Sequence, residues 1–272
     1  MIVNGNDIKK RILESIKQRA KISSILAAVI IGSEKNALRF IEAKKRAAQE
    51  AGITFKIIKK PSSISESTLQ KLVYGLGENK KIGGIILQLP LPKKINTEKI
   101  IKIIPEHKDP DCLLGVYFPN HQSRVMSPAV AAVKEVLRKA RKTLQDKNIV
   151  IIGQGQVTGK PIALWRELRK TKEVAVSMKG DKKRKEHLKK ADIIISGTGE
   201  AGIISVKELK KGALVVDFGY SKKGKDIKGD FNPRGAEEKE IDYTPTPGGT
   251  GPIVVAKVLE NFYKLNKKDK KA

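Results

Sequence analysis

The sequence predicts an α/β protein of two domains, each built on a parallel sheet covered by helices. Short apolar runs alternate with segments of helical periodicity along almost the whole chain, which is the order typical of a parallel sheet. The runs are rich in Ile and Val without polar alternation, as in strands buried on both faces. Prolines 105, 110 and 119 interrupt the pattern, and we place the domain junction there.

The first half carries strands and helices in alternation. The run 25–31 predicts a buried strand, and the following segment 36–50 has helical spacing that stops at Gly52. The remaining elements expected in this half are a strand at 54–58, a helix at 66–76 and a strand at 83–89.

The second half repeats this alternation. It begins with a helix over 127–142, because Ser127 supplies an N-cap and Pro128 suits the first helical position. The predicted strands are 148–152, 173–177, 192–196 and 213–217. The predicted helices are 160–169, 182–190, 205–210 and 251–265, with loops over 222–240.

The chain is strongly basic. Lys and Arg number 56 against 29 acidic residues, a net charge of +27, which invites a nucleic-acid interpretation. Aromatic residues make up only 4% and the lysines are spread over nearly every segment, whereas nucleic-acid surfaces concentrate charge and add stacking rings. We therefore favour a uniformly basic, solvated surface and expect no specific nucleic-acid partner.

Cysteine usage and the terminal sequence suggest the compartment. The single cysteine, Cys112, excludes an intrachain disulfide. The N-terminus lacks a basic segment followed by an apolar run, and the longest apolar stretch is far below the ~20 residues that span a bilayer. We expect a soluble, cytoplasmic protein without a signal peptide or membrane contact.

The most specific local pattern is a glycine-rich turn after the strand 148–152. Glycines stand at 153, 155 and 159, and a helix is expected to open at Pro161. Such a turn lets the backbone approach a phosphate closely, and the start of a helix offers N–H donors. A dinucleotide site is predicted, although a tight turn without a ligand remains the alternative.

The end of the next strand bears on which dinucleotide would bind. An NAD site usually shows an acidic residue at the end of that strand, but here Ser177 ends it and the basic segment 179–185 follows. Asp181 lies beyond the strand end, among these cations. The pattern favours NADP over NAD, the alternative being an ordinary solvated helix start.

In the first half, polar residues gather near predicted strand ends. Phe40 and Lys44 share one helix face, Gln88 ends a strand, and Asp109 and Asp111 follow in the next loop. The carboxyl ends of parallel strands are where open α/β sheets bind ligands. Taken singly, Lys44 suits a surface and Gln88 a capped strand end, so the argument depends on their combination.

That combination resembles the bifunctional methylenetetrahydrofolate dehydrogenase/methenyltetrahydrofolate cyclohydrolase family. The segments that carry the resemblance run in order through almost the whole chain. They are Phe40-Ile-Glu-Ala-Lys44, Gly84-Ile-Ile-Leu-Gln88-Leu-Pro-Leu-Pro92, Lys108-Asp-Pro-Asp111, Ser127-Pro128, the turn from Gly153 to Pro161, Val216-Asp-Phe-Gly219 and Thr244-Pro-Thr-Pro-Gly-Gly-Thr-Gly-Pro252.

The resemblance implies NADP-dependent oxidation of methylene-tetrahydrofolate to the methenyl form, followed by hydrolysis to formyl-tetrahydrofolate. These reactions belong to one-carbon metabolism and supply purine biosynthesis. It also implies a homodimer whose folate domain, 1–119 and 249–272, is completed by the C-terminal helix. The Rossmann-type nucleotide domain would then cover 120–248, with the active site in the cleft between the two domains.

The resemblance also assigns roles to residues. It makes Lys44, Gln88 and Asp111 catalytic: Lys44 is the acid/base group, Gln88 tunes and orients this lysine, and Asp111 anchors the folate. It implies no metal. The other residues expected to line the folate site are Phe40, Leu87, Leu89, Pro247, Gly248, Gly249 and Gly251. The residues expected at the cofactor are Gly153, Gln154, Gly155, Gly159, Ser177, Lys179 and Tyr220.

Several positions depart from the family pattern. Phe40 stands where the family usually has tyrosine, Cys112 where it has glycine, and Gln154-Gly155 where it has Arg-Ser. Tyr220 replaces a smaller aliphatic residue. An alternative function is therefore a family member that retains only one of the two activities.

Overall fold

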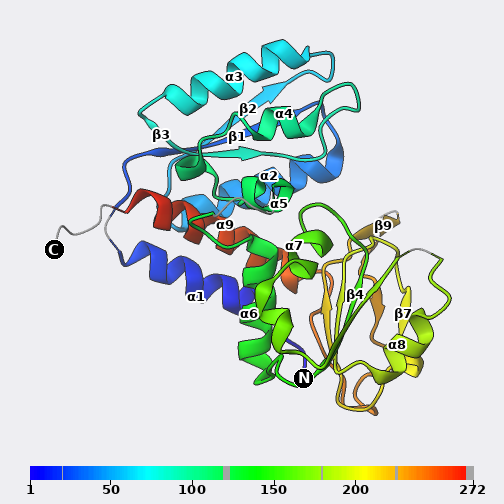
Figure 1. The fold of residues 1–272 in the computed structure, drawn as a ribbon. Coiled ribbons are helices and arrows are strands. Elements are labelled where there is room, and N and C mark those ends of the chain that lie inside the picture. The colour runs from blue at the N-terminus through cyan, green and yellow to red at the C-terminus, as the bar shows by residue number, and fades with distance from the viewer. Residues whose placement is uncertain (20, 119–122, 179, 224–225, 268–272) are drawn as a thin grey trace. The chain divides into compact units, whose positions relative to one another are not determined.

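The computed structural model describes residues 1–19, 21–118, 123–178, 180–223 and 226–267 (Figure 1). Contacts divide the chain into two compact units, each of which contains a parallel sheet. Lys10–Pro128 and Val255–Ala272 form one, named here the three-stranded unit, and Met1–Lys9 and Ala129–Val254 form the other, the five-stranded unit. The predicted α/β class with parallel sheets is confirmed.

The three-stranded unit has strand order β2-β1-β3, with β1 (Ile25–Ile31) in the centre. Strands β2 (Phe55–Lys60) and β3 (Ile82–Leu87) pair with β1 in parallel. The connecting helices are α2 (Lys35–Glu50) and α3 (Glu66–Glu78). Every residue of β3 is buried, which explains why this strand reads as an uninterrupted apolar run.

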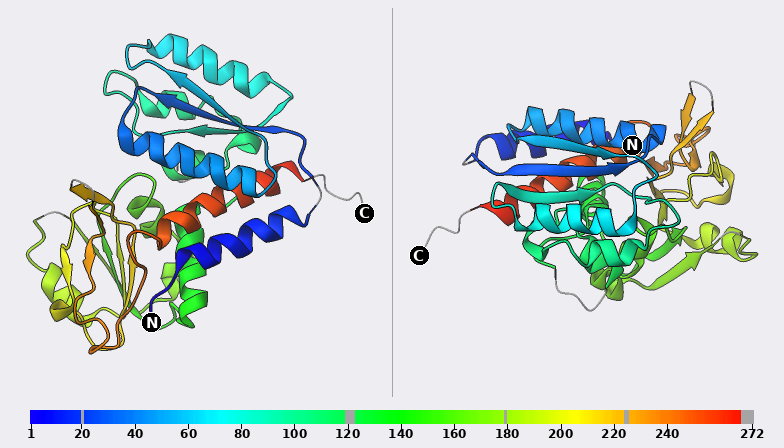
Figure 2. Two further views of the ribbon diagram at one scale, coloured as in Figure 1. Left: turned by 180° about the vertical axis from the view of Figure 1, so that it is seen from behind. Right: turned by 90° about the horizontal axis from the view of Figure 1, so that it is seen from above.

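Helices cover both faces of this sheet. Alternate residues of β1, including Ala27 and Val29, join a core with Leu69 and Val73 of α3. On the opposite face lie α2 and the C-terminal portion of α9 (Thr250–Asn266) (Figures 1 and 2). A Cβ atom on Gly84 of β3 would lie 2.7 Å from the Phe262 ring of α9, so this glycine permits the helix to pack closely.

The five-stranded unit has the order β12-β8-β6-β4-β5, and all four pairings are parallel. Its strands are β4 (Asn148–Ile152), β5 (Glu173–Ser177), β6 (Ile193–Ser196), β8 (Leu214–Asp217) and β12 (Asp242–Tyr243). Its helices are α6 (Pro128–Ala140), α7 (Gly159–Ala163) and α8 (Arg184–Lys190). Leu188 of α8 packs in one core with Val150, Ile152 and Ile194 of the sheet.

Some predicted elements require correction. The helix expected at 160–169 ends at Ala163, and a separate 3₁₀ turn occupies Arg166–Lys170 because Trp165 takes an extended conformation. The helix expected at 205–210 is a 3₁₀ turn, Val206–Glu208, held by a capping box. The expected loops over 222–240 contain the short strands β9 (Ser221–Lys223), β10 (Asp226–Lys228) and β11 (Phe231–Asn232).

Several helices were not predicted. The first is α1 (Gly5–Lys17), although its buried side chains Ile8, Ile12 and Ile16 recur at four-residue spacing. The short helices α4 (Thr97–Ile101) and α5 (Leu113–Tyr117) form among the prolines of the expected junction. Within the described residues, every helix is too short or too polar to cross a membrane.

The N-terminal residues contact the five-stranded unit. The amide of Val3 donates to the carbonyl of Tyr243 at 2.8 Å, and the amide of Gly5 donates to that of Gly248 at 2.8 Å. By contacts, therefore, residues 1–9 and 249–254 belong to the five-stranded unit, whereas the proposed folate domain includes both segments.

Candidate functional site

The structure brings Lys44 and Asp111 together. Lys44 lies on α2 and is only 9% exposed, and its Nζ lies 3.5 Å from Asp111 Oδ2. The two residues are 67 positions apart in the sequence. Lys44 is buried and Asp111 half-buried, so forming the pair costs free energy of desolvation, and its presence where apolar packing would serve points to a chemical role.

The loop that carries Asp111 is held from several sides. The buried Nζ of Lys108 donates to the carbonyls of Gly77 and Asn79, so it caps the C-terminal end of α3. The amide of Leu114 donates to Asp109 Oδ2 at 2.8 Å. These contacts fix the loop on both sides of Asp111.

Cys112 follows Asp111 in a left-handed conformation, with φ of 57°. Glycine adopts this conformation most easily, which gives a physical reason for the glycine usual in the resembling family. Burial raises the pKa of the Cys112 thiol to about 11, and its Sγ lies 3.3 Å from the carbonyl of Val125. At neutral pH the thiol is therefore protonated and is not a nucleophile.

Gln88 lies directly beyond the carboxyl end of β3. Its amide donates to Val29 of the central strand at 2.9 Å, and its Nε2 donates to the carbonyl of Leu89 at 3.0 Å. Its Oε1 is buried and meets no donor among the described residues. Among the described residues, no hydrogen bond joins Gln88 to Lys44. The glutamine therefore presents a buried acceptor without a partner near the edge of the sheet.

The other predicted folate-site residues differ in exposure. Phe40 lies one helical turn before Lys44 on α2 and is 39% exposed. Leu87 is buried at the end of β3, and Leu89 is half-buried. Pro247, Gly248, Gly249 and Gly251 lie in the five-stranded unit, around the start of α9.

The glycine-rich turn forms between β4 and α7, as predicted. Gly153 has φ of 86°, and a Cβ atom on Gly159 would lie 2.0 Å from the Gly153 carbonyl oxygen. The helix can begin this close to the strand only because position 159 lacks a side chain. At Gly155, by contrast, the nearest atom to a Cβ would be 4.0 Å away, so a phosphate can approach the backbone there.

The edge of the sheet beside this turn carries further predicted cofactor residues. Ser177, at the end of β5, is fully buried, and Lys179 lies outside the described residues. The Lys183 amide donates to Asp181 at 2.9 Å, and this bond is the main cause that lowers the pKa of the half-buried Asp181 carboxyl. Gln154 is exposed in the turn, and Tyr220 is half-buried beyond β8.

A pair of buried carboxyl groups lies beside the end of β8 and was not singled out from the sequence. Asp217 is 2% exposed and Asp230 is fully buried. Asp217 accepts from the amides of Gly219 at 2.6 Å and Phe231 at 3.0 Å. The pKa of Asp217 is raised to about 6: burial is the main cause and the neighbouring Asp230 carboxyl also raises it, whereas the amides that donate to Asp217 lower it.

This raised pKa predicts a pH dependence of stability. The folded chain holds a proton on Asp217 that the unfolded chain releases from a normal pKa near 3.8, so stability falls as pH rises from about 4 to about 6. Over this range the free energy of unfolding falls by about 3 kcal/mol in total, which corresponds to a shift of about two pKa units. Asp217→Asn should remove this decline.

The measurement is urea denaturation of wild type and Asp217→Asn at pH 4 and pH 7. Replacing the carboxylate also removes a hydrogen-bond acceptor, but this cost in stability is the same at both pH values and so cancels when they are compared. We expect the difference in unfolding free energy between the proteins to shift in favour of the variant at pH 7. Asp226→Asn, at an exposed position, is the control, and an equal difference at both values for Asp217→Asn would contradict the assignment.

In the part of the chain that the structure describes, no three His, Cys, Asp or Glu side chains gather as metal ligands. The candidate chemistry thus consists of an amine–carboxylate pair, a buried amide oxygen and a glycine turn open to phosphate.

In a comparison with known proteins, two family models match residues in both units of the chain. Residues 3–111 match the catalytic-domain model of tetrahydrofolate dehydrogenase/cyclohydrolase, and residues 127–270 match its NAD(P)-binding-domain model. The chain is 31% identical to the bifunctional protein FolD of Nitratiruptor sp., covering all of this chain and 99% of that protein. It is 32% identical to FolD of Hydrogenobaculum sp., with 98% of each chain covered.

Among solved structures, the bifunctional enzyme FolD, a methylenetetrahydrofolate dehydrogenase/cyclohydrolase from Campylobacter jejuni, is similar over 98% of both chains. Its TM-score is 0.90 and its sequence identity is 27%. Sequence, both domain models and fold agree, and the chain therefore belongs to the tetrahydrofolate dehydrogenase/cyclohydrolase family.

Proposed function

We propose that the chain oxidises methylene-tetrahydrofolate with NADP and then hydrolyses the methenyl product to formyl-tetrahydrofolate. The observation that carries this proposal is the ion pair of the buried Lys44 with the half-buried Asp111, in the unit that contains most of the matched catalytic domain. The buried Oε1 of Gln88 supports it, because a folate pterin ring presents N–H donors to such an acceptor.

Hydrolysis is the step that needs an acid/base group. Water adds to the methenyl carbon, and its oxygen gives up both protons as the formyl C=O forms. One proton reaches the nitrogen whose bond to this carbon breaks, and the other is released to solvent. Lys44 Nζ carries exchangeable protons and is held at 3.5 Å from Asp111, so we assign both transfers to it. In place of the roles that the resemblance implies, we assign orientation of the amine to Asp111, which lies 3.5 Å from Nζ, and substrate binding to Gln88, whose Oε1 has no partner among the described residues.

The dehydrogenase step depends on positioning. NADP, when bound, supplies the hydride acceptor. The turn from Gly153 to Gly159 fits a pyrophosphate because the backbone at Gly155 is open while Gly159 draws the helix against the strand. Ser177 and the cations that follow it favour the additional phosphate of NADP, with Lys179 and Tyr220 proposed as further cofactor contacts.

The test is to follow methenyl-tetrahydrofolate by its absorbance, with NADP and NAD assayed side by side. We expect a higher kcat/KM with NADP, whereas a higher value with NAD would show that the basic residues after β5 do not select the cofactor. In a second assay, methenyl-tetrahydrofolate is supplied directly and its hydrolysis is measured. No turnover in either assay would contradict the proposed function.

A member with one activity is the second candidate, and Phe40 favours it. The ring lies one turn from Lys44 but carries no hydroxyl to hydrogen-bond near the amine. Oxidation without enzymatic hydrolysis in the two assays would establish this candidate.

The proposal extends to assembly and place of action. We infer a homodimer that works in the cytoplasm, supplies one-carbon units for purine biosynthesis and has no specific nucleic-acid or membrane partner. The net charge of +27 then acts as a general surface property that attracts anionic folate and nucleotide.

A further inference from the structure

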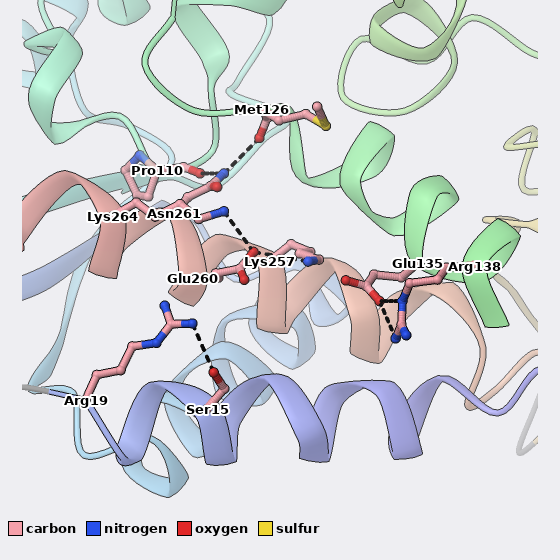
Figure 3. Close-up of polar contacts among 10 residues, drawn as sticks. All are labelled: Ser15, Arg19, Pro110, Met126, Glu135, Arg138, Lys257, Glu260, Asn261 and Lys264. Atoms are coloured by element: carbon pink, nitrogen blue, oxygen red, sulfur yellow. Dashed lines mark hydrogen bonds and ion pairs between the residues drawn. The ribbon is translucent and has the colours of Figure 1, made fainter. Parts of the chain in front are cut away.

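We infer that Asn261 is a positioning residue for the hydrolysis step, because it sets the place of Asp111 by holding the preceding peptide group. This inference rests on the proposed function. Asn261 lies on α9 and is 2% exposed. Its Nδ2 donates to the carbonyl of Pro110 at 2.9 Å and to that of Met126 at 2.8 Å (Figure 3).

Both hydrogens of the side-chain amide are used on backbone carbonyls. The Pro110 carbonyl belongs to the peptide bond that carries the Asp111 nitrogen, so fixing its oxygen fixes the plane of that peptide group. From there the chain leads directly to the carboxylate that lies 3.5 Å from Lys44 Nζ. Asn261 acts on the amine–carboxylate pair only through this peptide.

The second hydrogen bond, to the Met126 carbonyl, connects the Asp111 loop to another segment of the chain. Met126 follows Val125, whose carbonyl lies 3.3 Å from the Sγ of Cys112. Asn261 and Cys112 thus join the Asp111 loop and the segment 125–126 by two separate contacts. Without the asparagine, the buried Pro110 carbonyl and the part-buried Met126 carbonyl would lose this donor, and the loop would have to move to satisfy the buried one.

The helix that carries Asn261 is stabilised by ion pairs along its own length and by packing of the next residue into the core. Glu260 Oε2 accepts from Lys257 at 3.1 Å and from Lys264 at 3.2 Å (Figure 3). The adjacent Phe262 is fully buried. Asn261 therefore projects from a rigid support, which is what precise placement of a reacting group requires.

The chain offers a matched control in Asn266. It lies on the same helix, and its Nδ2 likewise donates to two carbonyls, those of Gly83 at 2.9 Å and Phe262 at 2.8 Å. Gly83 lies near the start of β3, away from the strand end that carries Gln88. Asn266→Leu removes this pair of bonds, together with the one that its Oδ1 accepts from Ser24 at 2.7 Å, without touching the Asp111 loop.

The experiment compares Asn261→Leu and Asn266→Leu, each in wild-type and Asp111→Ala backgrounds. For Asn261→Leu we expect kcat of hydrolysis to fall by about ten- to a hundred-fold, since small misplacements have effects of that size, with little change in KM. In the Asp111→Ala background the same substitution should have almost no further effect. Asn266→Leu should lower the melting temperature comparably but leave kcat unchanged.

Equal losses from Asn261→Leu in both backgrounds, or an equal loss of kcat from Asn266→Leu, would overturn the inference. If Asn261→Leu does not fold, Asn261→Ser, which keeps a single donor, replaces it in the same comparison. Hydrogen exchange supplies a readout independent of activity. Amides 111–114 should exchange faster in the Asn261 variant than in the Asn266 variant, and unchanged exchange there would overturn the inference even if the enzyme proves inactive.

Discussion

Lys44→Met is expected to reduce hydrolysis of methenyl-tetrahydrofolate by about a hundred- to ten-thousand-fold, the range that general acid–base catalysis contributes. The substitution removes the amine next to Asp111 and keeps an unbranched chain of similar volume. Because Lys44 is 9% exposed, methionine remains compatible with its surroundings. We expect a folded protein that has lost proton transfer.

Oxidation of methylene-tetrahydrofolate should fall less than hydrolysis, because that step depends on positioning two bound molecules. The measurement is the rate of each reaction with purified variant, together with its circular dichroism and melting temperature. Lys35→Met, at an exposed position on the same helix, is the control for loss of one charge. Hydrolysis at the wild-type rate in Lys44→Met would disprove the catalytic assignment.

Gly159→Ala is expected to destabilise the five-stranded unit by about 3 kcal/mol, at the upper end of typical overpacking costs. The added methyl group would lie 2.0 Å from the Gly153 oxygen and 2.8 Å from its carbon. Both atoms are backbone, so relief requires α7 to move away from β4. We expect weaker NADP binding, since the turn between them is the proposed phosphate site.

Gly155→Ala is the matched stability control. Its methyl group would meet no atom closer than 4.0 Å, so the unfolding free energy should stay near that of wild type. Urea denaturation and NADP titration by fluorescence are measured for both variants. If Gly159→Ala is as stable as Gly155→Ala, close packing of helix and strand is not what position 159 requires.

The buried strands were predictable because each is a run of apolar residues whose burial on both faces leaves a clear trace in composition. Strands β1 and β4 are buried in this way and occupy the predicted residues. The edge strand β5 also occupies the predicted residues, although most of them are half-buried or exposed. The glycine turn was also predictable, because its residues and the adjoining strand and helix are contiguous in sequence.

Errors arose where local pattern and folded structure give different answers. The helix predicted through residue 169 is broken at Trp165, whose extended backbone conformation the apolar spacing does not report. Helix α1 had the signal of regularly spaced isoleucines and was not assigned. The sequence signal for Asn261 is weak: it is a polar residue between Leu259 and Phe262, which are both fully buried.

The sequence by itself determined the fold class, most strands, the phosphate turn and the resemblance that named Lys44, Gln88 and Asp111. Only the tertiary structure decided which of these groups meet. It placed Asp111 beside Lys44 across 67 positions, and Asn261 against Pro110 across 151. The physical reason is that periodicity records whether a side chain is buried, whereas its partner is set by how distant elements pack, which no local pattern contains.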